Sequence, residues 1–321
     1  MKAYITGIGG VVGSALAPYL LDHGYEVEGS YFTPTTDIRE LDPRAKAFEL
    51  DLREHDKVAE YICASLPDVI YHLAAQSRPV PSWADPYYTM DVNVGGTVAI
   101  LEAVKKARDE NPGYDPNVIA ISSSAIYGDA LQKYTVENLP DETCEILPLH
   151  PYGVSKAAED LLCYQYYKNF GIRTMRIRLF NCTGRNKDQD ITGDFAKRAV
   201  KLERSGGNEL IVGNLTALRA ILDVRDLCSA LQILNEKGAP GEAYNICSSH
   251  IFRMDYVVTC LEQIMGVKYT LVEDPKLFRP ADEPLYAGRA DKIKALGWVE
   301  KYDYIDTVRE AVEYWRAHHF E

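Results

Sequence analysis

The sequence predicts an α/β protein with a doubly wound parallel sheet and a smaller, interleaved carboxyl-terminal domain. Short apolar strand patterns alternate with helical patterns from residue 3 to residue 178. The strand at residues 69–73 is an almost continuous apolar run, which is typical of a parallel strand buried on both faces. Beyond Asn181 the alternation loosens and polar turns become common. We therefore expect a first domain of residues 1–180 with about 221–248, and a second domain of residues 181–220 and 249–321.

The first strand pattern, at residues 3–5, runs into a glycine-rich turn and then into a helical pattern that extends to Leu21. The turn reads Thr-Gly-x-x-Gly-x-x-Gly. Gly7 allows the tight strand-to-helix turn, Gly10 lets the backbone approach a pyrophosphate, and Gly13 lets the helix pack closely on the sheet. The N–H groups at the start of the helix can bind phosphates. This stretch predicts a dinucleotide site of the Rossmann type.

The second strand pattern, at residues 25–32, ends where the cofactor ribose would lie. An acidic residue there favours NAD and an arginine favours NADP. Tyr31 and Phe32 are neither, and Asp37 and Arg39 follow in a loop. The choice between NAD and NADP therefore stays open.

The remaining strands of the sheet converge on one edge. Strand patterns follow at residues 47–50, 69–73, 118–121 and 172–178, and helices at residues 54–65, 87–110 and 151–169. The strand at 69–73 ends in Ala74 and Ala75, whose small side chains leave room for a flat ligand. His72, inside that strand, is interpreted as a core histidine with hydrogen-bond partners. Because ligands of doubly wound sheets bind at the carboxyl ends of the strands, we expect a crevice there.

The stretch from Ser122 to Lys156 carries the residues that suggest catalysis. Tyr152 and Lys156 are four residues apart, so a helix places both on one face. The lysine ammonium favours the phenolate, and the hydroxyl of Ser123, at a strand end, can bond the same substrate oxygen. Together the three side chains can move a proton on or off a carbinol oxygen while a hydride moves at carbon.

The carboxyl-terminal part is interpreted as a cap over the crevice. Helical patterns occupy residues 194–205, 226–236, 254–265 and 305–317, with a short strand and loop at 211–219 and a strand at 243–247.

Composition narrows the class of protein. A chain that is 46% hydrophobic and 26% charged is typical of a globular protein, and a net charge of -12 argues against nucleic acid as a partner. The chain enters a strand directly at its first residues and has no apolar run long enough for a membrane span, so we expect a cytoplasmic protein. Its seven cysteines show neither C-x-x-C nor Cys/His spacing, so we expect reduced thiols and no metal site.

The glycine turn, the Ser-Ser-x-x-Tyr-Gly run at 123–128 and the Tyr-x-x-x-Lys pair together resemble the extended short-chain dehydrogenase/reductase (NAD-dependent epimerase/dehydratase) family over essentially the whole chain. Within it, the chain is similar to enzymes of GDP-sugars, the GDP-mannose 4,6-dehydratases and the GDP-4-keto-6-deoxymannose reductases. The run Gly-Asn-Leu-x-Ala-x-Arg at 213–219 is the most specific match.

The resemblance implies roles for individual residues. The catalytic residues would be Ser123, Tyr152 and Lys156. NAD(P)(H) would contact Gly7, Gly10, Val11, Val12, Gly13, Tyr31, Asp51, Leu52, Leu73, Ala74, Ala75, Gln76, Asn93, Tyr152, Lys156 and Leu179. The nucleotide sugar would contact Ser77, Ser124, Ala125, Asn181, Lys197, Val212, Asn214, Arg219, Arg279 and Glu283. Of these, Asn181 and Arg219 would hold the diphosphate, and Arg279 the nucleotide end.

Two departures from the family pattern bear on the reaction. The 4,6-dehydratases have a glutamate at the position of Ala125, where it removes the proton alpha to a transient ketone; the reductases usually share it, whereas 4-epimerases often have small residues there. An alanine cannot accept a proton. The second departure is Ala220. In the family, an aspartate commonly follows the arginine that corresponds to Arg219.

The sequence therefore favours a 4-ketoreductase of a nucleotide sugar, GDP-linked by preference. The alternatives are an NAD-dependent 4-epimerase, a 4,6-dehydratase, which Ala125 disfavours, and a cofactor-sensing protein without catalysis. We also expect a homodimer through the helices at 87–110 and 151–169, because the second carries apolar side chains all round: Leu161, Leu162, Tyr164, Tyr166 and Tyr167.

Overall fold

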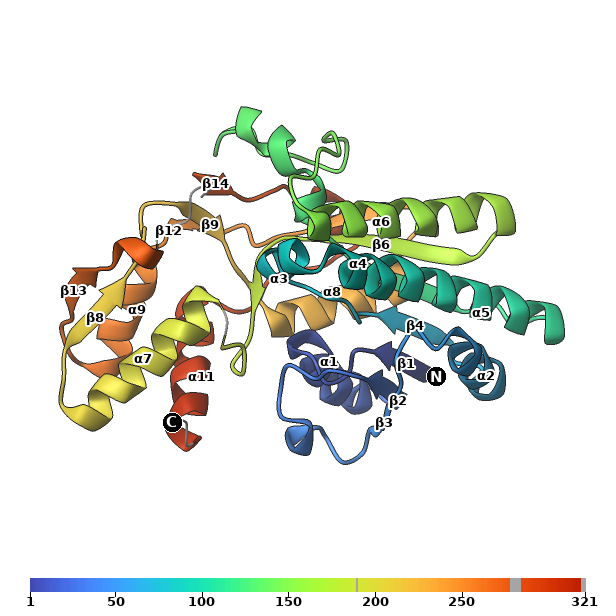
Figure 1. Cartoon of the computed structure of the whole chain (residues 1–321), viewed down its shortest axis with the longest axis horizontal. Coiled ribbons are helices and arrows are strands. Elements are labelled where there is room, and N and C mark those ends of the chain that lie inside the picture. Colours follow the sequence, from blue (N-terminus) through green and yellow to red (C-terminus); the bar gives the residue numbers. More distant parts are fainter. Residues whose placement is uncertain (189, 278–283, 319–321) are drawn as a thin grey trace.

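A parallel sheet forms the centre of the protein (Figure 1). The structure, a computed structural model, describes residues 1–188, 190–277 and 284–318. The sheet has seven strands in the order β11-β6-β5-β4-β1-β2-β3, all parallel. They are β1 (Lys2–Thr6), β2 (Glu26–Tyr31), β3 (Lys46–Glu49), β4 (Val69–His72), β5 (Asn117–Ser123), β6 (Arg173–Leu179) and β11 (Ala243–Ile246). The predicted doubly wound α/β fold is confirmed.

Helices cover both faces of the sheet because two separate sets of apolar side chains point away from it. On one face α1 (Val11–Asp22) packs against α8 (Val224–Lys237), and Leu16, Leu20 and Leu231 are buried there. On the other face lie α2 (His55–Ser65), α5 (Gly96–Glu110) and α6 (Pro151–Phe170), with Ile100 and Val104 in the core. The strand order reverses between β1 and β4, so a ligand crevice is expected at their carboxyl ends.

The helix expected at 87–110 contains an irregular turn. A short helix, α4 (Pro86–Met90), leads into the π-helical turn η2 (Asp91–Gly95), and α5 follows without a break. Another short helix, α3 (Pro79–Ala84), precedes them. The turn carries Asn93, and π-helical turns of this kind are frequent at functional sites.

A second hydrophobic core lies at one end of the molecule, where α7, α9 and α11 group together (Figure 1). Its helices are α7 (Ile191–Ser205), α9 (Tyr256–Met265) and α11 (Tyr304–Ala317), with the strands β8 (Glu209–Val212) and β13 (Thr270–Glu273). Helix α7 starts three residues before the predicted start, because Asp190 caps it by accepting a hydrogen bond from the backbone of Gly193. The strand β13 was not predicted; its side chains are exposed, so it lacks a buried apolar pattern.

The remaining helices and strands are short. They are the 3-10 turns η1 (Ile38–Glu40), η3 (Ser124–Ile126), η4 (Gly128–Lys133) and η5 (Pro275–Leu277), the helix α10 (Asp291–Lys294), and the strands β7 (Cys182–Thr183), β9 (Leu218–Ala220), β10 (Leu222–Asp223), β12 (Ile251–Arg253) and β14 (Leu285–Tyr286). Ile293 and Trp298 pack into the core next to the sheet, although residues 249–321 were expected in the smaller domain. The division into two domains stays a prediction.

Three further findings concern the described residues. None of their helices is long and apolar enough to cross a membrane. No group of three or more His, Cys, Asp or Glu side chains among them is placed to hold a metal ion. All seven cysteines lie in the described ranges and are unpaired.

Candidate active site

The glycine turn lies against the end of β4. Gly7 has a φ of +75°, and a Cβ there would lie 2.9 Å from the Cα of Ala74. A Cβ on Gly13 would lie 2.4 Å from the carbonyl oxygen of Gly7. The N-cap of α1 is Gly10, which has no side chain to bond the first N–H groups of the helix. The turn is therefore tight, and the first N–H groups of α1, which have no side-chain cap, are suited to an anion such as a pyrophosphate.

A buried polar chain holds the ends of β1 and β4 together behind this turn. The hydroxyl of Thr6 accepts hydrogen bonds from the backbone N–H groups of Leu73 and Ala74, both at 3.1 Å. The same hydroxyl lies 2.9 Å from Nδ1 of His72, whose Nε2 lies 3.1 Å from the hydroxyl of Thr97. Burial, with a smaller effect of the Lys156 charge, lowers the pKa of His72 to about 3. His72 is thus the neutral core histidine that the sequence predicted.

Asn93 connects the end of β4 to α6. Its amide oxygen accepts a hydrogen bond from the backbone of Gln76 at 2.7 Å, and its amide nitrogen donates to the backbone oxygen of Gln76 and to the hydroxyl of Ser155. Asn93 is fully buried. The structure therefore places this predicted cofactor residue behind the strand end, where it positions Gln76.

The Tyr152–Lys156 pair begins α6, next to the turn that follows β5. The side chain of Ser123 caps that turn, accepting a hydrogen bond from the backbone of Ala125 at 3.1 Å. A Cβ on Gly153 would lie 2.9 Å from the carbonyl oxygen of Ala125, so the two backbones are in close contact. Ser123 and Ala125 are thereby brought to the first turn of α6, which carries Tyr152.

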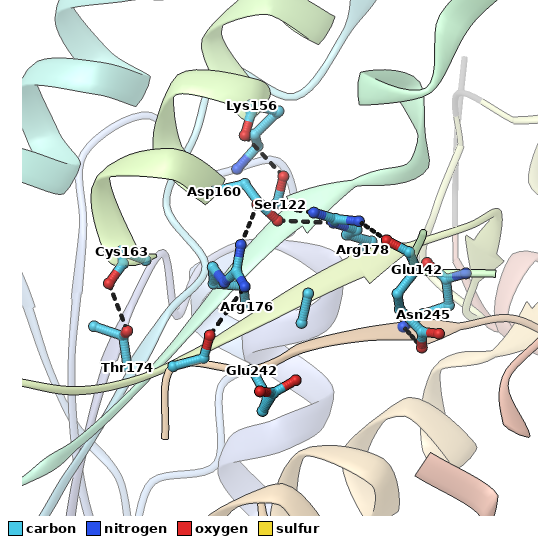
Figure 2. Close-up of polar contacts among 12 residues, drawn as sticks. Ser122, Glu142, Lys156, Asp160, Cys163, Thr174, Arg176, Arg178, Glu242 and Asn245 are labelled. Atoms are coloured by element: carbon cyan, nitrogen blue, oxygen red, sulfur yellow. Dashed lines mark hydrogen bonds and ion pairs between the residues drawn. The ribbon is translucent and has the colours of Figure 1, made fainter. Parts of the chain in front are cut away.

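Lys156 is buried and held by two acceptors. Its ammonium donates to the backbone oxygen of Ile121 at 2.6 Å and to the carboxylate of Glu159 at 2.7 Å. The backbone oxygen of Lys156 in turn accepts a hydrogen bond from the hydroxyl of Ser122 (Figure 2). These bonds fix the start of α6 against β5.

A layer of buried charges lies beside this contact, between α6 and β6. Figure 2 shows Asp160 between Arg176 and Arg178, with ion-pair distances of 2.7 Å and 3.0 Å. Arg178 also donates to the backbone oxygen of Glu142 at 2.8 Å. Burial lowers the pKa of Arg178, but the Asp160 carboxylate outweighs it and raises the pKa above its usual range. The pairs anchor α6 on the sheet.

Several predicted substrate residues lie on β9 and its neighbours. Tyr286 of β14 pairs in register with Arg219 of β9, and its hydroxyl lies 2.6 Å from that of Ser124. Ala220, the departure from the family pattern, is fully buried. The structure thus brings Ser124 and Arg219 toward one place through Tyr286, a residue that sequence reasoning missed.

A cavity of about 480 Å³ lies farther along, in the part of the chain with the second core. Its lining includes the predicted residues Val212 and Asn214, together with Arg253, Asp255 and Glu273. The other predicted substrate residues within the described ranges are not part of this lining. The ammonium of Lys197 lies over the ring of Trp315 at 4.7 Å. The backbone oxygen of Asn181 accepts a hydrogen bond from the backbone N–H of Leu222 at 2.9 Å. Arg279 and Glu283 lie outside the described residues.

The remaining predicted cofactor residues lie at or just beyond the ends of β2, β3, β4 and β6. Tyr31 ends β2, Leu52 is buried against Gly96, and Leu179 ends β6 half-buried. Asp51 bonds the guanidinium of Arg53, which lies over the ring of Tyr88 at 5.2 Å. Ser77 is exposed just beyond the strand end.

Lys187 is a second residue that sequence reasoning missed. Its ammonium donates to the backbone oxygen of Cys182 at 2.7 Å and lies 3.2 Å from Asp190. Burial lowers its pKa, but Asp190, Cys182 and the nearby Tyr152 outweigh burial and raise it. The only signal in the sequence was a cation in the loop after Asn181.

Comparisons with known proteins agree with this geometry. The sequence model of the GDP-mannose 4,6 dehydratase family matches residues 4–311. A GDP-6-deoxy-D-mannose reductase of Pseudomonas aeruginosa is 29% identical over 98% of this chain and 97% of its own. A UDP-glucose 4-epimerase of Lacticaseibacillus casei is 26% identical over 100% of this chain and 98% of its own.

A solved structure, that of RMD from Pseudomonas aeruginosa complexed with NADPH, superposes with a TM-score of 0.81 at 27% identity, covering 98% of this chain and 99% of that chain. The parallel sheet, the glycine turn at its topological switch point and the match across nearly the whole chain lead to one conclusion. This protein belongs to the GDP-mannose 4,6 dehydratase family, among the extended short-chain dehydrogenases/reductases.

Proposed function

We propose that this protein reduces the 4-keto group of a nucleotide-activated sugar, GDP-linked by preference, with NADH or NADPH as the reductant. The observation that carries the proposal is the Tyr152–Lys156 pair beside a turn whose residue 125 is alanine. The pair can transfer a proton, and Ala125 offers no carboxylate for the proton abstraction that elimination of water requires.

The glycine turn supports NAD(P)(H) as the cofactor. Side chains at Gly7 or Gly13 would collide with backbone atoms, and the start of α1 is left open to a pyrophosphate. A related reductase was solved with NADPH. Tyr31 at the end of β2 still leaves the choice between NAD and NADP open.

Each proposed catalytic residue has one task in the reduction. Bound NADH or NADPH supplies the hydride that becomes bonded to C4. Tyr152 gives its phenolic proton to the carbonyl oxygen, which becomes a hydroxyl. Ser123 donates a hydrogen bond to that oxygen and orients it, while Lys156 stabilises the phenolate until it takes a proton from water.

The substrate assignment is supported by cations and by a related enzyme. A nucleoside diphosphate is a polyanion, and the protein has a net charge of -12, so local cations must bind it. Arg219, with Asn181, is the proposed diphosphate ligand, and Lys197 is proposed as a further contact of the nucleotide sugar. The cavity at Val212 and Asn214 is the proposed base site. GDP is favoured because the reductase from Pseudomonas aeruginosa acts on a GDP-sugar by its name.

A 4-epimerase is the second candidate, because a related UDP-glucose 4-epimerase matches the whole of this chain. The reaction of an epimerase moves a hydride at C4 and needs no carboxylate at residue 125. An epimerase would retain its NAD through purification and turn over without added cofactor.

The deciding experiment mixes the protein with NADH or NADPH and a GDP-4-keto-6-deoxy sugar, and follows the absorbance of the reduced cofactor. We expect oxidation that depends on the sugar. Absence of oxidation with GDP-, UDP- and dTDP-linked 4-keto sugars alike would overturn the ketoreductase proposal. Interconversion of 4-hydroxyl epimers without added cofactor would instead support the epimerase.

We also propose a homodimer through the helices predicted for it at 87–110 and 151–169, which are α4, α5 and α6, with α3 beside them. Trp83 and Tyr87 are 65% and 84% exposed, and Leu161 on α6 is 54% exposed. Large apolar side chains on neighbouring helices are typical of a surface that binds a second protein chain.

A further inference from the structure

Glu159 lies on the far side of Lys156 from Tyr152. The residues at positions 152, 156 and 159 follow one stripe of α6 at spacings of four and three. The Glu159 carboxylate is fully buried and accepts a hydrogen bond from the Lys156 ammonium at 2.7 Å. Its other oxygen has no hydrogen-bond partner among the described residues. The family resemblance assigned no role to this residue.

Glu159 differs from its neighbour Asp160 in how its charge is compensated. Asp160 has two arginine partners, Arg176 and Arg178, so it is satisfied without Lys156 (Figure 2). Among the described residues, the hydrogen-bond and ion-pair partner of Glu159 is Lys156 alone. Burial raises the pKa of Glu159 to about 7, and the Lys156 charge acts in the opposite direction.

Other charged and titratable groups lie on Glu159's own helix and on the elements of the sheet and helices around it. On α6 these are Lys156, Asp160 and Cys163, on β6 they are Arg176 and Arg178, and on β4 it is His72; β5 contributes only neutral side chains, and α5 places Glu102 against Tyr166. Lys156 is the one cation of this set that bonds Glu159 directly.

An ammonium has three N–H donors. The fold uses two of them, one to Ile121 and one to Glu159, which leaves a single donor for a ligand or for Tyr152. A buried carboxylate next to the ammonium also weakens the positive field that reaches the phenol.

We propose that Glu159 is a positioning residue that fixes the ammonium of Lys156 and offsets part of its charge at Tyr152. The part of this inference that concerns Tyr152 rests on the proposed ketoreductase function. The part that concerns the Lys156–Glu159 pair does not, and the two are tested separately.

The first test needs no substrate or cofactor. Infrared titration of the parent protein should show a protonated carboxyl band that disappears near pH 7 and is absent from Glu159→Gln. In Lys156→Met the band should persist to a pH about one unit higher or more, because the stabilising cation is gone. If the parent protein shows no such band because Lys156 keeps Glu159 ionised, the band should appear in Lys156→Met. A band that Lys156→Met leaves unchanged, or that is absent from both proteins, would overturn the pairing.

The second test is the pH profile of kcat/KM for reduction. Tyr152 must carry its proton, so the rate falls as the pH rises. Glutamine keeps an acceptor for Lys156 but removes the negative charge, so the falling limb of Glu159→Gln should move toward lower pH. Glu102→Gln, which removes a carboxylate that bonds Tyr166 on the same helix, is the matched control and should leave the limb in place. An unmoved limb in Glu159→Gln would overturn the charge effect.

If no 4-keto sugar is reduced, the ketoreductase proposal fails, and the infrared result still decides the Lys156–Glu159 pairing.

Discussion

Asn93 donates a hydrogen bond to the hydroxyl of Ser155 across 2.8 Å, joining the π-helical turn before α5 to the helix that carries Tyr152. Ser155 passes the contact on, since its hydroxyl donates to the backbone oxygen of Tyr152 at 2.8 Å. The same Asn93 side chain holds both backbone groups of Gln76 at the end of β4. One buried amide therefore sets the distance between the strand end and the first turn of α6.

Replacing Asn93 by alanine should loosen both sides of the site. The backbone N–H of Gln76, which is partly buried, would lose its partner, and the buried hydroxyl of Ser155 would lose a donor, so the free energy of unfolding should fall by about 1–3 kcal/mol. The affinity for NAD(P)H should fall as well. Urea denaturation and a fluorescence titration of the cofactor measure the two effects. Asn111→Ala removes a half-buried amide at the end of α5 and is the control, with a smaller loss of stability and no loss of affinity.

Tyr152→Phe removes one oxygen atom and leaves the ring. We expect turnover to fall about 10²- to 10⁴-fold, because the proton donor is lost, while the cofactor still binds. Stopped-flow assays of the reduced cofactor and a binding titration separate the two quantities. Tyr164→Phe, an exposed tyrosine on the same helix, should retain full activity. Equal activity of the two variants would remove Tyr152 from the mechanism.

His72 should make folding sensitive to acid. The hydrogen bonds assign its neutral form, with Nε2 donating to Thr97 and Nδ1 accepting from Thr6. Its folded pKa of about 3 lies below the unfolded value of about 6.5, so its contribution to stability is present above pH 6.5 and is lost as the pH falls toward 3.

The expected loss is roughly 1.4 kcal/mol per pH unit below about 6.5. His72→Gln should therefore lose less stability than the parent between pH 7 and pH 5, by about 2 kcal/mol. Denaturant unfolding at both pH values measures the difference. His23→Gln, at the exposed end of α1, should follow the parent. Parallel curves for the parent and His72→Gln would show that folding does not lower the pKa of His72.

The glycine turn and the Tyr152–Lys156 pair could be located from the sequence because their geometry depends on residues close together in the chain. A strand, a turn and a helix place Gly7 and Gly13, and one helical turn places Tyr152 beside Lys156. The doubly wound parallel sheet followed from the alternation of strands and helices.

Contacts between distant segments could not be predicted in this way. Tyr286 meets Ser124 across 162 residues of chain, and Asn93 meets Ser155 across 62. The role of Glu159 could not be predicted for a different reason. A charged residue on a helix usually faces solvent, and the tertiary packing shows that this one is fully buried. The strand β13 was missed because its exposed residues give no periodic pattern.

The proposed dimer predicts that a charge on α6 breaks the association. Leu161→Lys should convert the dimer to a monomer, because an ammonium cannot be buried in an apolar contact without a partner. Analytical ultracentrifugation measures the mass. Val299→Lys, at a site that is 65% exposed in the loop after Trp298, is the control and should remain dimeric. A parent protein that sediments as a monomer would contradict the proposal outright.

Ala125→Glu tests whether a missing base is all that separates this protein from a dehydratase. The backbone at residue 125 contacts the first turn of α6 and bonds Ser123, so a glutamate there begins beside the proposed catalytic residues. The parent should release no water from GDP-mannose. The variant should form the dehydrated 4-keto product, at a rate about 10²-fold or more above the parent's background, because a carboxylate can take the proton alpha to the transient ketone. Mass spectrometry detects the loss of water. Ala125→Gln has the same shape but no base, so equal product from the glutamine and glutamate variants would contradict the argument.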